Sequence, residues 1–175
     1  MKRKAVSGTV LMLLLTSMLA LALNIQPVKT EPTTIVVPDD YPTIQKAINN
    51  AREGDTIFVK SGIYHENVVV NKTVTILGES TTTTIIGSTF SMGARFEVLA
   101  NNVTIAGFTM RWAYYGILSR SSYNLFYNNL IVAMHVYGIC VSGGFSIITN
   151  NTIHQAGVGG IEFFGANNNL VPIIL

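Results

Sequence analysis

Carboxylate side chains, which perform most hydrolysis of glycosidic bonds, are scarce in the second half of this 175-residue sequence. After Glu66 the chain contains only Glu79, Glu97 and Glu162, and no aspartate follows Asp55. Glycoside hydrolysis needs two carboxyl groups about 5 to 9.5 Å apart. No second carboxylate accompanies Glu162 at the repeat spacing described below, so we expect no catalytic residue and lean towards a chain that is not an enzyme.

Histidine, methionine and cysteine supply the candidate metal ligands. Met134, His135 and Cys140 are of types that copper accepts. However, Met134 and His135 are adjacent, so in a strand they would face opposite sides, and the spacing of His135 and His154 does not match the repeat period. We therefore expect neither a metal site nor another cofactor. We interpret the single cysteine, Cys140, as a buried small apolar side chain.

One aromatic cluster stands out, formed by Trp112, Tyr114 and Tyr115. We expect it in a turn just before Gly116, where flat ring faces could hold sugar rings. Tyr123 and Tyr127 are expected to extend the same surface. These five residues are the candidate carbohydrate contacts, and the alternative is that their rings pack over a loop or the edge of the core.

Three asparagines stand in Asn-x-Thr sequons, the acceptor sequence for N-linked glycans. They are Asn71, Asn102 and Asn150. An exported chain with several sequons suits a glycoprotein, although an Asn- and Thr-rich chain generates sequons by chance. These three are the candidate glycosylation sites.

The elements that must position these side chains follow a 22-residue repeat. Gly116-Ile117, Gly138-Ile139 and Gly160-Ile161 recur at this spacing, as do Asn128-Asn129 and Asn150-Asn151. Short β-branched runs bounded by Gly, Asn or Ser indicate strands, and a period of this size indicates stacked units. The fold class is therefore all-β, a right-handed parallel β-helix. The second asparagine of each pair is expected in the left-handed conformation of a sharp turn and in an axial hydrogen-bonded ladder.

An amphipathic helix is predicted at residues 42–51, because Ile44, Ala47, Ile48 and Ala51 form one apolar stripe. We expect its start signal at Asp39 or Asp40 with Pro42. The early coils are less regular, since the strand at Val74 recurs only at Val103, later than the repeat period would place it. The additional residues are expected in a loop within 81–95, where they either form the wall of a binding groove or are simply tolerated.

Residues 1–23 have the three-part pattern of a secretory signal, with Lys2, Arg3 and Lys4 before an apolar run. An uncleaved membrane anchor is the alternative. Residues 24–34 are interpreted as a linker and 35–175 as the β-helix domain. Charged residues make up 11% of the sequence, and no basic stripe for nucleic acid is present. We expect an extracellular or cell-surface location.

The segments Asp40-Tyr41-Pro42-Thr43-Ile44-Gln45, Gly62-Ile63-Tyr64-His65-Glu66 and Val74-Thr75-Ile76-Leu77-Gly78-Glu79 together resemble the opening of pectin-lyase-like right-handed β-helix proteins. The Gly-Ile and Asn-Asn repeats resemble the NosD-type branch, a carbohydrate-binding and sugar-hydrolysis domain. The resemblance covers residues 36–170. It implies that the helix is an N-terminal cap, but the paired aspartates of pectinesterases and pectate lyases are missing.

Three functions are compatible with these features. The first is a non-catalytic extracellular β-helix that binds or presents polysaccharide or cell-surface glycan. The second is a partial or degenerate polysaccharide-modifying enzyme, and the third is an adhesin-like stalk or a NosD-type copper-related accessory protein. The apolar last residues, 171–175, do not form the polar cap that a solenoid end needs, so we expect an incomplete domain whose end is covered by further coils or a partner.

Overall fold

The computed structural model describes residues 12, 31–87, 89–165 and 167–171. The signal pattern at residues 1–23, apart from Met12, and residues 172–175 lie outside the described residues. The fold belongs to the compact unit Pro32–Leu175. No helix in the part of the chain that the structure describes is long and apolar enough to cross a membrane.

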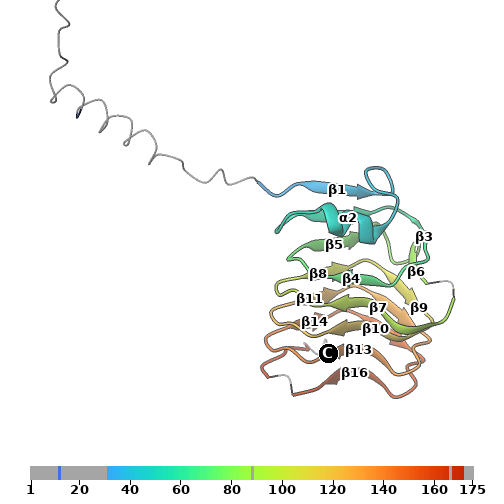
Figure 1. Cartoon of the computed structure of the whole chain (residues 1–175). Coiled ribbons are helices and arrows are strands. Elements are labelled where there is room, and N and C mark those ends of the chain that lie inside the picture. Colours follow the sequence, from blue (N-terminus) through green and yellow to red (C-terminus); the bar gives the residue numbers. More distant parts are fainter. Residues whose placement is uncertain (1–11, 13–30, 88, 166, 172–175) are drawn as a thin grey trace, which may run out of the picture. The chain divides into compact units, whose positions relative to one another are not determined.

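Three parallel sheets run along this unit and confirm the predicted parallel β-helix (Figure 1). Each coil contributes one strand to each sheet in turn. The first sheet contains β1 (Thr34–Val37), β2 (Thr56–Val59), β5 (Thr75–Gly78), β8 (Thr104–Ala106), β11 (Leu125–Tyr127) and β14 (Ile147–Thr149). The second contains β3 (Gly62–Tyr64), β6 (Thr84–Ile86), β9 (Thr109–Arg111), β12 (Leu130–Val132) and β15 (Thr152–His154). The third contains β4 (Val68–Val70), β7 (Ser91–Val98), β10 (Ala113–Ser119), β13 (Tyr137–Val141) and β16 (Gly159–Phe163).

The 22-residue repeat sets the register of the last coils. Ile117 pairs with Ile139, and Ile139 pairs with Ile161, so these side chains stack along the axis of the core. The glycines before Ile117 and Ile139 have a steric cause: a Cβ on Gly138 would lie 2.6 Å from Cγ2 of Ile153, on the facing sheet. The coil is narrow at this point, and only glycine lets the two sheets approach.

A short helix, α2 (Ile44–Asn50), covers the N-terminal end of the core through Ile44, Ala47 and Ile48, all fully buried. The expected start signal at Asp39 or Asp40 with Pro42 was wrong. The N-cap is Thr43, whose side chain accepts a hydrogen bond from the backbone N–H of Lys46. The helix is therefore shorter than the predicted residues 42–51.

Glu66, the last residue of the Gly62-x-Tyr64-x-Glu66 motif, stabilises this cap. The Glu66 carboxylate accepts hydrogen bonds from the backbone N–H groups of Ile44 and Gln45, both at 3.0 Å. These are donors that a helix leaves unpaired at its first turn. The Gln45 side chain in turn bonds both the N–H and the C=O of Val69, on β4. The cap thus closes the end of the core and the edge of the third sheet.

Each coil turns at three corners, and residues with positive φ line up at each corner along the axis. The columns are Asn102, Tyr123, Phe145 and Asn168; Gly107, Asn128 and Asn150; and Gly87, Trp112, Ala133 and Gln155. The expectation for the asparagine pairs was wrong in one respect, because the first member adopts the left-handed conformation. The second member forms the expected ladder: Asn129 Nδ2 donates to Asn151 Oδ1 at 3.0 Å and to the carbonyl of Ile105.

Candidate functional site

The expected aromatic cluster does not lie in a single turn. Trp112 occupies the corner between β9 and β10 with φ 55° and is 43% exposed, whereas Tyr114 and Tyr115 belong to β10 itself. Strand pairing with β7 and β13 draws these two tyrosines into the third sheet. Among the described residues, no aromatic ring stacks on Trp112.

The two strand tyrosines stack on rings of neighbouring coils. Tyr114 stacks on His135 with centroids 5.2 Å apart, and Tyr115 stacks on Tyr137 at 6.4 Å. Phe90 and Phe164 add edge-on contacts to these two stacks. One face of each tyrosine ring is therefore occupied by another ring, which leaves at most the opposite face, the ring edges and the hydroxyl group for a ligand.

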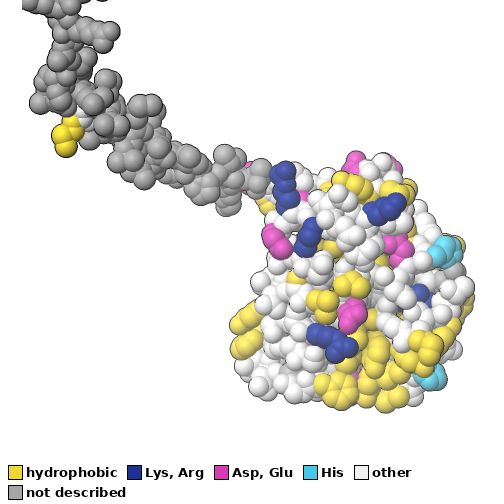
Figure 2. Space-filling view, in the orientation of Figure 1, with side chains coloured by type: hydrophobic (Ala, Val, Ile, Leu, Met, Phe, Trp, Pro, Cys, Tyr) yellow, Lys and Arg dark blue, Asp and Glu magenta, His cyan; other side chains and the backbone are white. Residues whose placement is uncertain are grey.

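These rings belong to an exposed apolar surface on the third sheet and its corner with the second. Figure 2 shows hydrophobic side chains gathered over the part of the unit where Figure 1 places β13 and β16. Its exposed members include Phe90 (55%), Met92 (75%) and Phe164 (55%). We call this surface the aromatic face, defined by Phe90, Met92, Tyr114, Tyr115, His135, Tyr137 and Phe164.

Tyr123 and Tyr127 do not extend the aromatic face. Tyr123 lies at the corner between the third and first sheets, and Tyr127 ends β11 in the first sheet. Tyr123 instead stacks on Phe145, with centroids 5.1 Å apart and an interplanar angle of 6°. Phe145 was not among the candidates predicted from the sequence, although it lies one repeat period after Tyr123, which was a usable signal.

The additional residues of the irregular coil are divided between the segment from β5 to β6 and the segment from β6 to β7, in and just before the predicted window of 81–95. Residues of the second segment line a cavity of about 370 Å³ together with His65, Glu66 and Asn67. Arg95 clamps this segment although it is only 3% exposed. Its guanidinium donates to the carbonyls of Arg111, Thr89 and Trp112 and to Oδ1 of Asn67. Burial lowers the pKa of the Arg95 guanidinium from its ordinary value.

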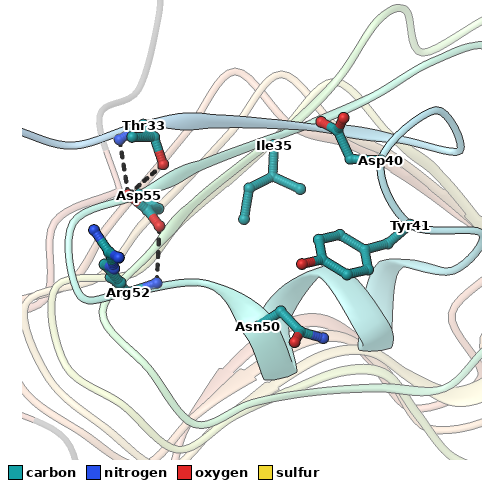
Figure 3. A pocket seen from close by; sticks show the side chains of 7 residues that line it. All are labelled: Thr33, Ile35, Asp40, Tyr41, Asn50, Arg52 and Asp55. Carbon is teal, nitrogen blue, oxygen red and sulfur yellow. Dashed lines mark hydrogen bonds between the residues drawn. The ribbon is translucent and has the colours of Figure 1, made fainter.

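A second cavity, of about 520 Å³, lies beside β1 and α2 (Figure 3). Ile35, Tyr41 and Asn50 surround its open space, and Asp55 lies at its edge. The Asp55 carboxylate accepts hydrogen bonds from the backbone N–H groups of Thr33 and Arg52, at 2.7 and 2.8 Å, and from the Thr33 hydroxyl. Burial alone would raise the pKa of Asp55, but these hydrogen bonds hold it below its ordinary value. Asp55 thus pairs with backbone N–H groups beside β1 and α2, at the N-terminal cap.

Glu97 and Glu162 do not form a hydrolytic pair. Glu97 and Glu162 occupy one outward column of the third sheet, but Leu118 and Cys140 lie between them. Three rungs separate the two carboxylates by about 14 Å, which exceeds the spacing that glycoside hydrolysis needs. Glu97 also pairs with Arg120 at 3.1 Å.

The candidate metal ligands are dispersed. Met134 is buried at a corner, whereas the adjacent His135 is exposed on the aromatic face, and Cys140 is a buried free thiol whose pKa is raised by burial. His154 is exposed at the end of β15. Among the described residues, no group of three or more His, Cys, Asp or Glu side chains lies close enough to hold a metal ion.

The sequon asparagines, like the corner residue Asn128, differ from the asparagines that link neighbouring coils. The side chains of Asn71, Asn102 and Asn150 are exposed and make no hydrogen bond to any described residue. Those of Asn101, Asn124, Asn129, Asn151 and Asn169 all hold backbone or side-chain partners in neighbouring coils. All three sequon amides are therefore sterically available, with no structural bond to break.

Two comparisons with known proteins agree with this architecture. The family model described as right handed beta helix region matches residues 97–172. A cell surface glycoprotein of Methanothermus fervidus is 32% identical over 127 residues, which cover 71% of this chain and 18% of the glycoprotein. The chain thus spans less than a fifth of that relative's length. No solved structure matches the chain.

Proposed function

We propose that this chain is a non-catalytic, exported β-helix of the cell surface that presents N-linked glycan on its coil corners. The observation that carries the proposal is the contrast between the three free sequon asparagines and the bonded asparagines of the ladders. A random sequon in an Asn-rich solenoid would often fall on a ladder residue, where a glycan would cost buried hydrogen bonds.

The relative supports the cell-surface location, because its printed name is cell surface glycoprotein. The predicted signal at residues 1–23 supplies the route of export. The low density of charge and the Asn- and Thr-rich surface suit a molecule that works among hydroxyl-rich polymers. Within the β-helix class, the Gly-Ile and Asn-Asn repeats favour the NosD-type branch.

The experiment is expression in a cell that attaches N-linked glycans to exported proteins, followed by glycopeptide mass spectrometry. We expect sugar on Asn71, Asn102 and Asn150 and none on Asn129 or Asn151. Thr104→Val is the matched control for one site, because valine has nearly the shape of threonine but destroys the sequon. Complete absence of glycan from all three asparagines in such a host would contradict the proposal.

A second candidate function is polysaccharide binding at the aromatic face together with Trp112, which occupies the adjacent corner between β9 and β10. It is favoured by the exposed Phe90 and Met92 beside a cavity and by Trp112, whose ring carries no aromatic partner among the described residues. Glycan-array binding tests this function, with Trp112→Asn as the variant, since asparagine tolerates the left-handed corner. Tyr127→Phe, outside the aromatic face, is the control. Binding that Trp112→Asn leaves unchanged would exclude Trp112 as a contact.

The enzyme alternative is tested by incubation with pectins, with Glu162→Gln as the control. Release of methanol, reducing ends or unsaturated products by the wild type alone would overturn the non-catalytic assignment. A chain that carries no glycan, binds no polysaccharide and turns over no substrate would be left with the role of a stalk.

A further inference from the structure

The corner column that contains Asn102 places an exposed aromatic ring on the next rung. The backbone N–H of Asn102 donates to the carbonyl of Ser122, that of Tyr123 to Gly144, and that of Phe145 to Asn167. Repetition of one bond puts Asn102, Tyr123 and Phe145 in a single axial column. Their φ angles are 55°, 62° and 58°, so the three side chains leave the corner in the same direction.

The free face of the Tyr123 ring points towards Asn102. Phe145 covers the opposite face, with the two ring centroids 5.1 Å apart and the ring planes nearly parallel. Adjacent rungs are separated by about 4.8 Å, which is close to the contact distance between a flat ring and the apolar face of a sugar. Tyr123 and Phe145 are 55% and 50% exposed, so neither ring is enclosed by other described residues.

The backbone does not require aromatic residues at this corner. Asparagine occupies the same column at Asn102 and Asn168, and it tolerates positive φ better than a bulky side chain does. The presence of two aromatic residues in this conformation therefore needs another reason. Their mutual stacking accounts for the Tyr123 face that contacts Phe145, but not for the opposite face of the Tyr123 ring.

We propose that the first sugar of a glycan on Asn102 packs on the Tyr123 ring, so that the Tyr123–Phe145 stack is a built-in platform for that glycan. This inference rests on the proposed function, because it needs Asn102 to be modified. It makes Asn102 different from Asn71 and Asn150, and it gives the corner column a recognisable role: to orient one glycan along the axis of the solenoid.

The test uses the full chain with Asn71→Gln and Thr152→Val, so that Asn102 is the sole remaining sequon. The melting temperatures of four variants of this chain are compared. Two carry Tyr123 and two carry Tyr123→Asn, and one of each pair also carries Thr104→Val, which removes the glycan from Asn102. We expect the Asn102 glycan to raise the melting temperature by about 2 to 4 °C when Tyr123 is present, and by much less with Tyr123→Asn. Phe145→Asn is the control, since it leaves the face towards Asn102 intact and should preserve most of the effect.

A second readout does not depend on stability. NMR of the glycosylated chain should show the C–H protons of the first sugar shifted upfield by the Tyr123 ring current, and Tyr123→Asn should abolish the shift. The packing of the sugar on Tyr123 would be overturned if Asn102 carries a glycan, its sugar protons show no ring-current shift, and the glycan raises the melting temperature equally with Tyr123 and with Tyr123→Asn. The proposed function would still hold in that case. In the chain that keeps all three sequons, glycan on Asn71 or Asn150 but not on Asn102 would also overturn this packing, and no glycan at any site would overturn both.

Discussion

Single residues in this chain owe their roles to backbone groups that the coil geometry leaves unpaired. Arg95, Asp55 and Glu66 are charged, yet each is bonded mainly to main-chain carbonyls or N–H groups. Buried polar backbone groups are costly without partners. These three charged side chains therefore stabilise the N-terminal cap and the segment between β6 and β7.

Arg95→Ala should lower the free energy of unfolding by about 3 kcal/mol, because it removes the side-chain donor of the Arg111 and Thr89 carbonyls and one of the two donors to the Trp112 carbonyl. Urea unfolding followed by circular dichroism measures the change. Arg120→Ala is the control, since its exposed pair with Glu97 should contribute less than about 1 kcal/mol. Equal effects of the two substitutions would show that Arg95 is not a clamp.

Asp55 should make the fold sensitive to acid. Its pKa is lower in the folded chain than the unfolded value of about 3.9, so the ionised form stabilises the fold above about pH 4. That contribution is lost as the pH falls through the folded-state pKa. The free energy of unfolding, measured with urea, should differ less between pH 7 and pH 3 for Asp55→Asn than for the wild type. Thr33→Val, which removes one of the three donors, should fall between them, and an unchanged difference in Asp55→Asn would contradict the assignment.

At the scale of elements, corners and ladders determine how the strands stack. The first asparagine of each Asn-Asn pair supplies the left-handed bend, and the second supplies hydrogen bonds between coils. The two roles are separate because only the second side chain points into the coil. Asn129 is 2% exposed and bonds the backbone of Phe108 and Ile105.

Asn129→Ala should therefore cost about 2 to 3 kcal/mol, because it leaves buried partners on two coils unpaired. Asn128→Gly is the matched control one residue away, and it should change stability by less than about 0.5 kcal/mol, since glycine adopts positive φ readily. Thermal and urea unfolding of the two variants measure this difference. A larger loss in Asn128→Gly than in Asn129→Ala would reverse the assignment of roles.

At the scale of the whole molecule, the core is three axial stacks rather than one globular centre. Successive inward side chains of the first sheet, Ile57, Ile76, Ile105, Phe126 and Ile148, pair in register from β2 to β14. In a solenoid each coil contacts only its neighbours, so stability depends on the continuity of these stacks.

Phe126→Ala should break the first-sheet stack at β11, next to its last strand β14, and cost about 3 to 5 kcal/mol, because the side chain is fully buried. Phe164→Ala, on the exposed aromatic face, should cost less than about 1 kcal/mol. Hydrogen exchange should show loss of protection in β11 and in its neighbours β8 and β14 for the first variant. Protection that stays uniform across all coils would contradict nearest-neighbour behaviour.

The sequence by itself determined the parallel β-helix, the strand register of the last coils, the capping helix and the place of the irregular coil. A constant repeat period brings equivalent side chains to equivalent positions, so register follows from spacing alone. Only the tertiary structure decided which asparagine bends and which bonds, that Trp112 and Tyr114 lie on different elements, and that Tyr123 stacks on Phe145 beside Asn102. The physical reason is that spacing fixes a residue's rung and column, whereas the direction of its side chain depends on the sign of φ at the corner and on partners one coil away.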